Sequence, residues 1–470
     1  MKLLKKCCAI LLVMVLGIAL VACGGRTSAK GSKNNSEGIS GDDALQSAIK
    51  KVLEEKEEVN ISFWTSTSQV NFPYLQAIVD AFQEEYPNIH VDMAAQGAVN
   101  DLMDKLTQNV VSKTTPTISN LNPTYFSEYI NSDAIIDLMP YYADAKIGFT
   151  DSEKETFYPF YIDEVMSFGE EGTMYGFPTN KKTADILFYN KTYFDTQDWE
   201  APTTWDEVID YSKRIKEDTG MAGFSYDVAY AEAAFKLMSM QWGSPYIDSE
   251  GNVSIDNEAS RQALNFYKKN FDAGYFTMPS EMPSAGGGNY SNKGFVVKEC
   301  YMFVGASAGM PYSLPKAEAG QEVFEVGAAA IPQKDVNNRI AFSKGEDYCI
   351  FSNASAQERV AAWLLIKFMS GDDQNVEWYT FTGNLPITST ILENSDYQEF
   401  LNKSNDGSGE YYRSAAVNAA LDMMDYMKNE QFSPITASLA TECGEMWKAV
   451  IIGGADIDES IANVVVKVTK

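Results

Sequence analysis

The chain has 470 residues and a formal net charge of −28 at pH 7, and 45% of its residues are hydrophobic. This acidic surplus repels nucleic acid and anionic lipid headgroups, so we expect neither as a partner. The length exceeds what one hydrophobic core usually holds, and we therefore expect two α/β domains.

The first 22 residues have the pattern of a secretory signal peptide. Three lysines among the first six residues precede an apolar run, residues 9–21, that is too short to span a bilayer comfortably. The run ends in Leu20-Val21-Ala22-Cys23, which resembles a bacterial lipobox. This resemblance implies cleavage before Cys23, a lipid on its thiol, and a place on the extracellular face of a Gram-positive cell membrane. The alternative is a stop-anchor helix that ends in a cysteine by chance.

The segment from residue 23 to residue 58 connects this anchor to the body. Residues 24–41 are rich in Gly, Ser, Asn and Lys, and we expect a flexible tether. Apolar residues then recur at helical spacing over 44–53, which predicts a short surface helix. Cleavage would remove three lysines and no acidic residue, so the formal charge of the remaining chain would change from −28 to −31.

The body begins with a strand–helix–strand pattern. Val59, Ile61 and Phe63 alternate as in a strand, residues 75–86 have an apolar helical face, and residues 89–93 alternate again. A unit of this length predicts a right-handed crossover in a parallel sheet. Capping boxes at Thr204 and Ser355 predict two later helices.

The downstream cysteines are Cys300, Cys349 and Cys443. They have no metal-ligand spacing, and an odd number cannot pair completely. Buried thiols are favoured over a disulfide.

One motif typical of catalysis is present. Residues 305–309 fit G-x-S-x-G, the nucleophile elbow of α/β-hydrolases, in which a histidine base follows the serine in the chain. The chain's one histidine is His90, far upstream on a predicted strand. Without a base the Ser307 hydroxyl remains a weak nucleophile, so a structural or ligand-contacting turn is favoured and no enzyme activity is expected.

No metal or cofactor is expected either. His90 stands alone, which does not make a zinc site, and no phosphate-binding or dinucleotide motif occurs. Residues 248–251 resemble a calcium loop only faintly, and their strand-like flanks predict a β-hairpin turn instead.

Several spaced segments carry a family resemblance. In chain order they are Ile61–Trp64, Tyr175–Asn180, Leu187–Lys191, Pro202–Glu207, Lys298–Phe303 with its glycine-rich turn, Gly327–Pro332, Ala361–Met369 and Thr382–Ile387. Their order and spacing resemble the extracellular solute-binding proteins of ABC importers, the sugar and glycerol-phosphate binders.

That resemblance implies a two-lobed periplasmic-binding-protein fold of type II, with a ligand cleft between lobes joined by crossing strands. Lobe 1 would comprise residues 59–180 and 343–382, and lobe 2 residues 183–340 and 384–470. The lobes would close on the ligand, and the closed form would dock on the membrane permease.

The resemblance and the strand ends together suggest residues for the cleft. The candidate ligand-binding residues are Trp64, Thr65, Ser66, Ser68, Asn122, Tyr230, Trp242, Ser307, Glu346 and Asp347. Aromatic rings suit the apolar face of a sugar ring, and the polar groups satisfy hydroxyls that would otherwise be buried unpaired. For any single aromatic residue, however, core packing is the commoner role, and we expect it for Trp205 and Trp363.

The expected ligand is a neutral saccharide, with an oligosaccharide favoured. Cys300–Gly309 and Thr382–Thr388 resemble glycerol-3-phosphate binders most closely, which makes a glycerol phosphate or glycerophosphodiester the alternative. Those proteins place a phosphate-contacting arginine near the C-terminus, where this chain has Ala437. Arg339, Arg413 or Lys181–Lys182 could take its place. A buried phosphate without a cation is costly.

We therefore expect a lipid-anchored, monomeric substrate-binding component of an ABC importer. A secreted hydrolase and a purely structural lipoprotein are the rival classes. The missing base disfavours the first, and the two-lobed cleft pattern disfavours the second.

Overall fold

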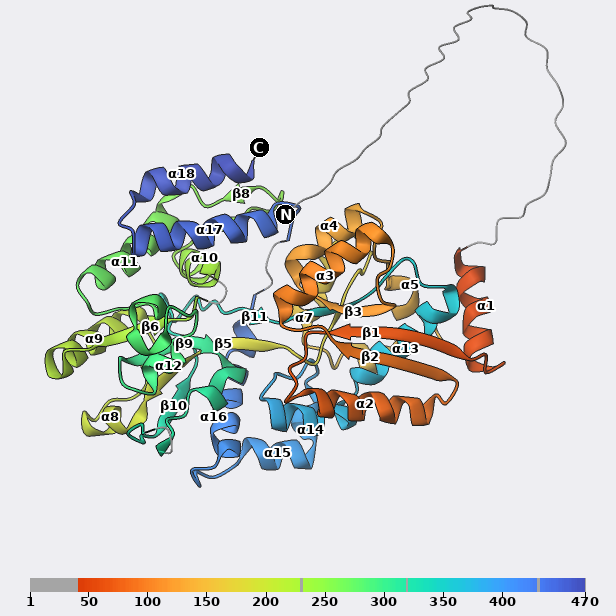
Figure 1. Cartoon of the computed structure of the whole chain (residues 1–470), viewed down its shortest axis with the longest axis horizontal. Helices are drawn as coiled ribbons and strands as arrows, with labels where there is room; N and C mark the ends of the chain where they lie inside the picture. The colour runs from red at the N-terminus through yellow and green to blue at the C-terminus, as the bar shows by residue number, and fades with distance from the viewer. Residues whose placement is uncertain (1–40, 229–230, 318–319, 429–431, 470) are drawn as a thin grey trace, which may run out of the picture. The chain divides into compact units, whose positions relative to one another are not determined.

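The computed structural model describes residues 41–469 except 229–230, 318–319 and 429–431 (Figure 1). The predicted signal peptide, Cys23 and most of the predicted tether lie outside the described residues. Between residues 41 and 469, no described helix has both the length and the hydropathy needed to cross a bilayer.

The first sheet has the strand order β2-β1-β3-β12-β4. β1 (Val59–Thr65) pairs in parallel with β2 (Ile89–Ala95) and β3 (Ile118–Leu121). β12 (Asp347–Ile350) runs antiparallel to β3 and to β4 (Phe177–Pro178). Helix α2 (Phe72–Glu85) connects β1 to β2 and buries the predicted apolar face, which confirms the expected β–α–β unit.

The second sheet has the order β10-β5-β9-β6, and a short strand, β11, also pairs with β5. Its strands are β5 (Thr183–Asn190), β6 (Ala222–Tyr226), β9 (Cys300–Ala306), β10 (Val326–Ala329) and β11 (Ser343–Lys344). β9 and β10 run antiparallel to β5, whereas β6 runs parallel to β9. The hairpin predicted around residues 248–251 joins β7 (Tyr246–Ile247) to β8 (Val253–Ser254).

Helices cover both sheets (Figure 1). The α-helices of the first half are α1 (Gly41–Leu53), α3 (Val99–Ser112), α4 (Phe126–Asn131), α5 (Met139–Tyr142), α6 (Asp151–Lys154), α7 (Pro159–Met166), α8 (Lys191–Thr196), α9 (Trp205–Thr219) and α10 (Ala231–Gln241). The second half contains α11 (Glu258–Asp272), α12 (Asn292–Phe295), α13 (Ala356–Met369), α14 (Asp372–Thr382), α15 (Ser395–Leu401), α16 (Gly409–Leu421), α17 (Thr436–Ile451) and α18 (Ile457–Val468). Among the 3₁₀ turns are η1 (Pro123–Tyr125) and η4 (Ser307–Tyr312).

The predicted capping boxes are present. The Thr204 hydroxyl accepts a hydrogen bond from the Glu207 amide at the start of α9, and Ser355 does the same for Glu358 at the start of α13. These contacts satisfy amides that the first helical turn leaves without partners.

The core residues largely agree with the sequence expectations. Trp205 and Trp363 are fully buried, as predicted. Cys300, Cys349 and Cys443 are buried and form no disulfide among the described residues, which confirms the expectation of buried thiols.

The chain passes between the two sheets at short extended segments. Residues 179–182 lead from β4 to β5, and residues 345–346 lead from β11 to β12. A third segment meets the first of these at an isolated antiparallel β-bridge between Leu385 and Lys182. Gly345 has φ of 143°, and a Cβ there would lie 3.0 Å from the Lys182 side chain, so a larger residue would be strained at this close approach. The lobe boundaries themselves remain a prediction.

Candidate ligand-binding site

A cavity of about 360 Å³ is lined by strands of the second sheet and by segments that follow strands of the first sheet. This volume lies within the usual range for small-molecule sites. The lining residues are Ser66, Val99, Asn122, Pro123, Thr124, Glu164, Lys181, Thr183, Asp185, Asp227, Glu232, Ala233, Lys236, Leu237, Tyr290, Ala306, Ile331, Ala341, Phe342, Ser343, Lys344, Gly345, Glu346 and Phe432.

Strand ends position much of this lining. Ser66 follows β1, Asn122 follows β3, and Asp227 follows β6, while Ala306 is the last residue of β9. The carboxyl ends of strands in open α/β sheets are where ligands commonly bind. The site therefore occupies the position that this class of fold favours.

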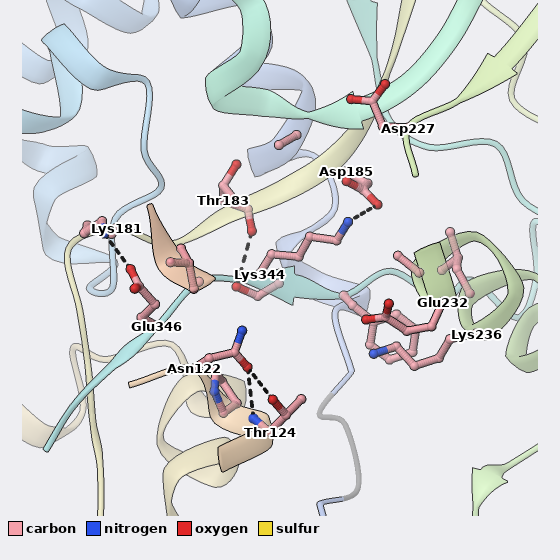
Figure 2. A pocket seen from close by; sticks show the side chains of 18 of the residues that line it. Asn122, Thr124, Lys181, Thr183, Asp185, Asp227, Glu232, Lys236, Lys344 and Glu346 are labelled. Carbon is pink, nitrogen blue, oxygen red and sulfur yellow. Dashed lines mark hydrogen bonds and ion pairs between the residues drawn. The ribbon is translucent and has the colours of Figure 1, made fainter. Parts of the chain in front are cut away.

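A three-way polar contact joins the first sheet to the two connecting segments (Figure 2). Lys181 Nζ lies 2.5 Å from Glu346 Oε2, and the same ammonium donates to the Ser66 hydroxyl. Ser66 in turn donates to both Glu346 oxygens, at 2.7 and 2.8 Å. The contacts hold the nearly buried Glu346 carboxylate in one orientation at the cavity wall.

A second ion pair lies within the second sheet. Lys344 Nζ lies 2.6 Å from Asp185 Oδ2, and the Tyr226 hydroxyl donates to the same oxygen at 3.1 Å. Burial, followed by the Asp185 charge, raises the pKa of Tyr226 well above its usual value. The tyrosine therefore acts here as a neutral hydrogen-bond donor.

A third ionic group is deeply buried and reaches the cavity lining through Glu164. Lys182 Nζ lies 2.9 Å from Glu164 Oε1 and 2.8 Å from Asp347 Oδ1. Burial opposes the charge on Lys182, but the two carboxylates outweigh it and raise its pKa. Burial raises the pKa of Asp347 well above its usual value, so this carboxyl holds a proton more readily. Protonation of Asp347 lowers the electrostatic cost of enclosing two acids with one cation.

Asp227 is a half-buried carboxylate that faces the cavity. Its Oδ1 accepts a hydrogen bond from the Ser291 amide at 2.6 Å. Burial raises its pKa from 3.8 to about 7; the Ser291 hydrogen bonds oppose this shift, and the nearby Asp185 adds to it. Gly305 makes room for the side chain, because a Cβ there would lie 2.6 Å from Asp227 Oδ2.

Three aromatic side chains are among the described residues that line the cavity: Tyr290, Phe342 and Phe432. Tyr290 is 58% exposed, so much of its side chain is available for contact. No tryptophan is among the described lining residues, although the sequence suggested Trp64 and Trp242. The aromatic surface of the site thus comes from residues other than those expected.

Of the candidate residues, Ser66, Asn122 and Glu346 line the cavity. Tyr230 lies outside the described residues. The remaining candidates do not line the cavity; they are Trp64, Thr65, Ser68, Trp242, Ser307 and Asp347.

The local structure explains why several of these candidates do not line the cavity. β1 extends to Thr65, so Trp64 lies inside the strand rather than after it, and Thr65 is buried. Ser68 is exposed. Trp242 packs on Phe266, with ring centroids 5.0 Å apart.

Ser307 is buried, and its hydroxyl lies 2.7 Å from that of Thr183. The chain's one histidine does not serve it as a base, because His90 lies on β2 and contacts Glu58 at 2.7 Å. Among the described residues, no group of three histidine, cysteine or carboxylate side chains is placed to hold a metal ion.

Sequence reasoning missed several lining residues that carried a local signal. Asp185 interrupts the apolar run of β5, and Asp227 directly follows the buried strand β6. A carboxylate in either position is costly unless it serves a contact. Tyr290 and Phe432 lie in loops and gave no comparable signal.

Comparison with known proteins places this fold and chain in a family. A family model of bacterial extracellular solute-binding proteins matches residues 77–402. The arabinooligosaccharide-binding protein of Halalkalibacterium halodurans is 22% identical over 396 residues, covering 81% of this chain and 82% of that protein. The sn-glycerol-3-phosphate-binding periplasmic protein UgpB of Pectobacterium atrosepticum is 20% identical over 365 residues, covering 73% and 77%.

Solved structures agree on the fold. UgpB from Mycobacterium tuberculosis, in complex with glycerophosphocholine, superposes with a TM-score of 0.70 at 16% identity, covering 87% of this chain and 97% of that one. Maltose-bound MalE3 from T. maritima gives 0.68 at 19% identity, covering 87% and 99%. These likenesses confirm the predicted two-lobed α/β fold. Because the family model spans well over half of the sequence, the chain belongs to the bacterial extracellular solute-binding proteins.

Proposed function

We propose that this protein captures a carbohydrate outside the cell and delivers it to the permease of an ABC importer. The observation that carries the proposal is the composition of the cavity. Aromatic rings from Tyr290, Phe342 and Phe432 lie in the same cavity as carboxylate, amide and hydroxyl groups. Rings can cover the apolar face of a sugar, and the polar groups can accept or donate to its hydroxyls.

The same cavity is poorly suited to a phosphate, which is the alternative ligand group. No arginine is among the described lining residues. Arg413 donates to the Thr380 carbonyl at 3.1 Å, and Arg339 stacks 4.1 Å from the ring centroid of Tyr426. Lys181 is already paired with Glu346. A phosphate at Lys181 would therefore have to compete with an existing ion pair.

The names of the relatives divide between the two ligand classes. The relative from Halalkalibacterium halodurans is named for arabinooligosaccharides, and MalE3 was solved with maltose. The UgpB proteins are named for sn-glycerol-3-phosphate. The cavity chemistry favours the first group over the second.

The remaining parts of the proposal rest on the sequence. The protein is anchored by a lipid on Cys23, lies on the extracellular face of the cell membrane and acts as a monomer without catalytic activity. Residues 178–183, 340–345 and 382–384 act as hinge segments, and the lobes they connect close around the ligand. Closure by a ligand that contacts both lobes is a shift between two populations.

A thermal-shift screen tests the carbohydrate proposal directly. The panel comprises neutral mono- and oligosaccharides, glycerol-3-phosphate and glycerophosphocholine. A ligand at about 100 times its Kd stabilises the folded protein by about 2.7 kcal/mol, which such a screen detects readily. We expect one or more saccharides to raise Tm, and a response confined to the glycerol phosphates would contradict the proposal.

A further inference from the structure

The cavity lining contains more acidic than basic side chains. Among the described lining residues there are five carboxylates and three lysines. Glu346 pairs with Lys181 and Asp185 with Lys344, while Glu164 pairs with the buried Lys182. These pairs account for three of the five acids.

The other two acids, Asp227 and Glu232, form no ion pair with a lysine or arginine among the described residues, although Lys236 lies beside Glu232 on α10 and the charge of Lys344 lowers the pKa of Asp227 (Figure 2). The gaps within residues 41–469 could not supply one, because residues 229–230, 318–319 and 429–431 contain no lysine, arginine or histidine. Two carboxylates therefore line the ligand space without an ion pair to a described residue, and the described lining holds five acids against three lysines, one of which is Lys236. A charge in that position is costly until a partner compensates for it.

Asp227 also has an aromatic neighbour. Tyr290 directly precedes Ser291, whose amide donates to Asp227 Oδ1 at 2.6 Å, and both Tyr290 and Asp227 line the cavity. Burial raises the pKa of Tyr290, and the charge of Asp227 raises it further. Tyr290 is the most exposed of the three cavity rings. A carboxylate next to an accessible ring face is a combination that recognises cations, through an ion pair and a cation–π contact.

We infer that the carbohydrate bound in this cavity carries a protonated amino group, which docks against Asp227 and the ring of Tyr290. The inference rests on the proposed function, because it narrows the carbohydrate to an amino sugar or an amine-bearing oligosaccharide. Glu232 strengthens the negative potential at the same cavity. The net charge of −28 acts in the same direction, since it favours the capture of cations over anions.

A neutral sugar could also donate hydroxyl groups to these acids, so the discriminating measurement compares ligands that differ at one position. The probes are glucose, glucosamine and N-acetylglucosamine, the three corresponding galactose compounds, and the matching β-1,4-linked disaccharides. Calorimetric titration of the purified protein gives the affinity for each member of a set. We expect the free amine to bind at least about tenfold more tightly than its hydroxyl and N-acetyl counterparts, because a charge-assisted hydrogen bond is about twice as strong as a neutral one.

Variants assign the preference to the residue. Asp227→Asn keeps the shape of the side chain but removes its charge, and we expect it to abolish the preference for the amine. Asp163→Asn makes the same charge change at an exposed position on α7 and is the matched control. Circular dichroism shows whether each variant folds, and Tyr290→Leu tests the ring independently.

The outcomes separate this inference from the proposed function. Tighter binding of amines that Asp227→Asn removes and Asp163→Asn preserves supports the inference. Equal or tighter binding of the neutral members overturns the inference but leaves the carbohydrate function intact. If no amine binds, the inference is also wrong, and if no saccharide of any kind binds, the proposed function fails as well.

Discussion

Lys182 Nζ lies 2.8 Å from Asp347 Oδ1, and only 1% and 0% of the two side chains are exposed. Their neighbours Lys181 and Glu346 form the adjacent pair at the cavity wall. Two consecutive residues of one connecting segment therefore pair with Glu346, which ends the other connecting segment, and with Asp347, the first residue of β12. The two ion pairs fix the relative position of these segments.

Replacing the buried lysine should destabilise the protein strongly. Lys182→Met would leave Glu164 and Asp347 enclosed without a cation, and we expect a loss of about 3 kcal/mol in the free energy of unfolding. Lys181→Met is the matched control, because its partner lies at the cavity wall and its side chain is 16% exposed. Urea denaturation monitored by tryptophan fluorescence compares them. A larger loss for Lys181→Met would show that the buried group is not the stabilising one.

The free energy of unfolding should also depend on pH through the ionisation of Asp227. Burial raises its pKa from 3.8 to about 7 in the folded protein, so the folded state holds the proton more tightly than the unfolded chain does. Its contribution to stability is present in full below about pH 4 and is lost as the pH rises through about 7. Asp227→Asn stays neutral, and its Tm relative to wild type should therefore increase between about pH 4 and about pH 8.

The control for this experiment is Asp163→Asn, whose carboxylate is exposed. Its Tm difference from wild type should remain flat over the same range. A constant or falling difference for Asp227→Asn would mean that Asp227 is ionised in the folded protein at mildly acidic pH.

Ser307→Ala should affect stability and not catalysis. The variant removes the hydroxyl 2.7 Å from that of Thr183, and we expect a loss of about 1 kcal/mol. Hydrolysis of a nitrophenyl ester should be the same for the variant and the wild type, since His90 contacts Glu58 instead of Ser307. An esterase activity that the substitution removes would contradict the structural role.

The anchor is tested in cells with the full-length chain. Cys23→Ser removes the thiol that the Leu20–Cys23 motif would expose to lipid transfer. We expect loss of metabolic labelling with palmitate and release of the protein into the medium, or accumulation of its precursor. Unchanged labelling and membrane retention would rule out the lipobox.

Local patterns in the sequence predicted the elements that depend on neighbouring residues. Alternation gave β1 and β2, apolar spacing gave α2, and the capping boxes at Thr204 and Ser355 marked α9 and α13. Each of these features arises from contacts within a few turns or strands. Such contacts can be inferred from spacing alone.

The site was predicted only in part, because its contacts are long-range. Asp185 and Lys344 pair across 159 residues, and nothing local to either residue indicates the other. Trp64 was placed in the cleft because β1 was expected to end before it, and the strand continues to Thr65. Ser66, Asn122 and Glu346 line the cavity because each lies just beyond or between strands, where the family resemblance and the fold agree.

The central claim is that the cavity binds a carbohydrate rather than a phosphate ester. Calorimetric titration of the purified protein with the saccharides that raise Tm, and with glycerol-3-phosphate and glycerophosphocholine, tests it most directly. Glu346→Gln serves as the cavity variant, because Glu346 lines the site and is held by Ser66 and Lys181. The account predicts saturable, one-to-one binding of a saccharide that Glu346→Gln weakens, with no heat from either phosphate. Saturable binding of a phosphate ester, with no response to any saccharide, would contradict it.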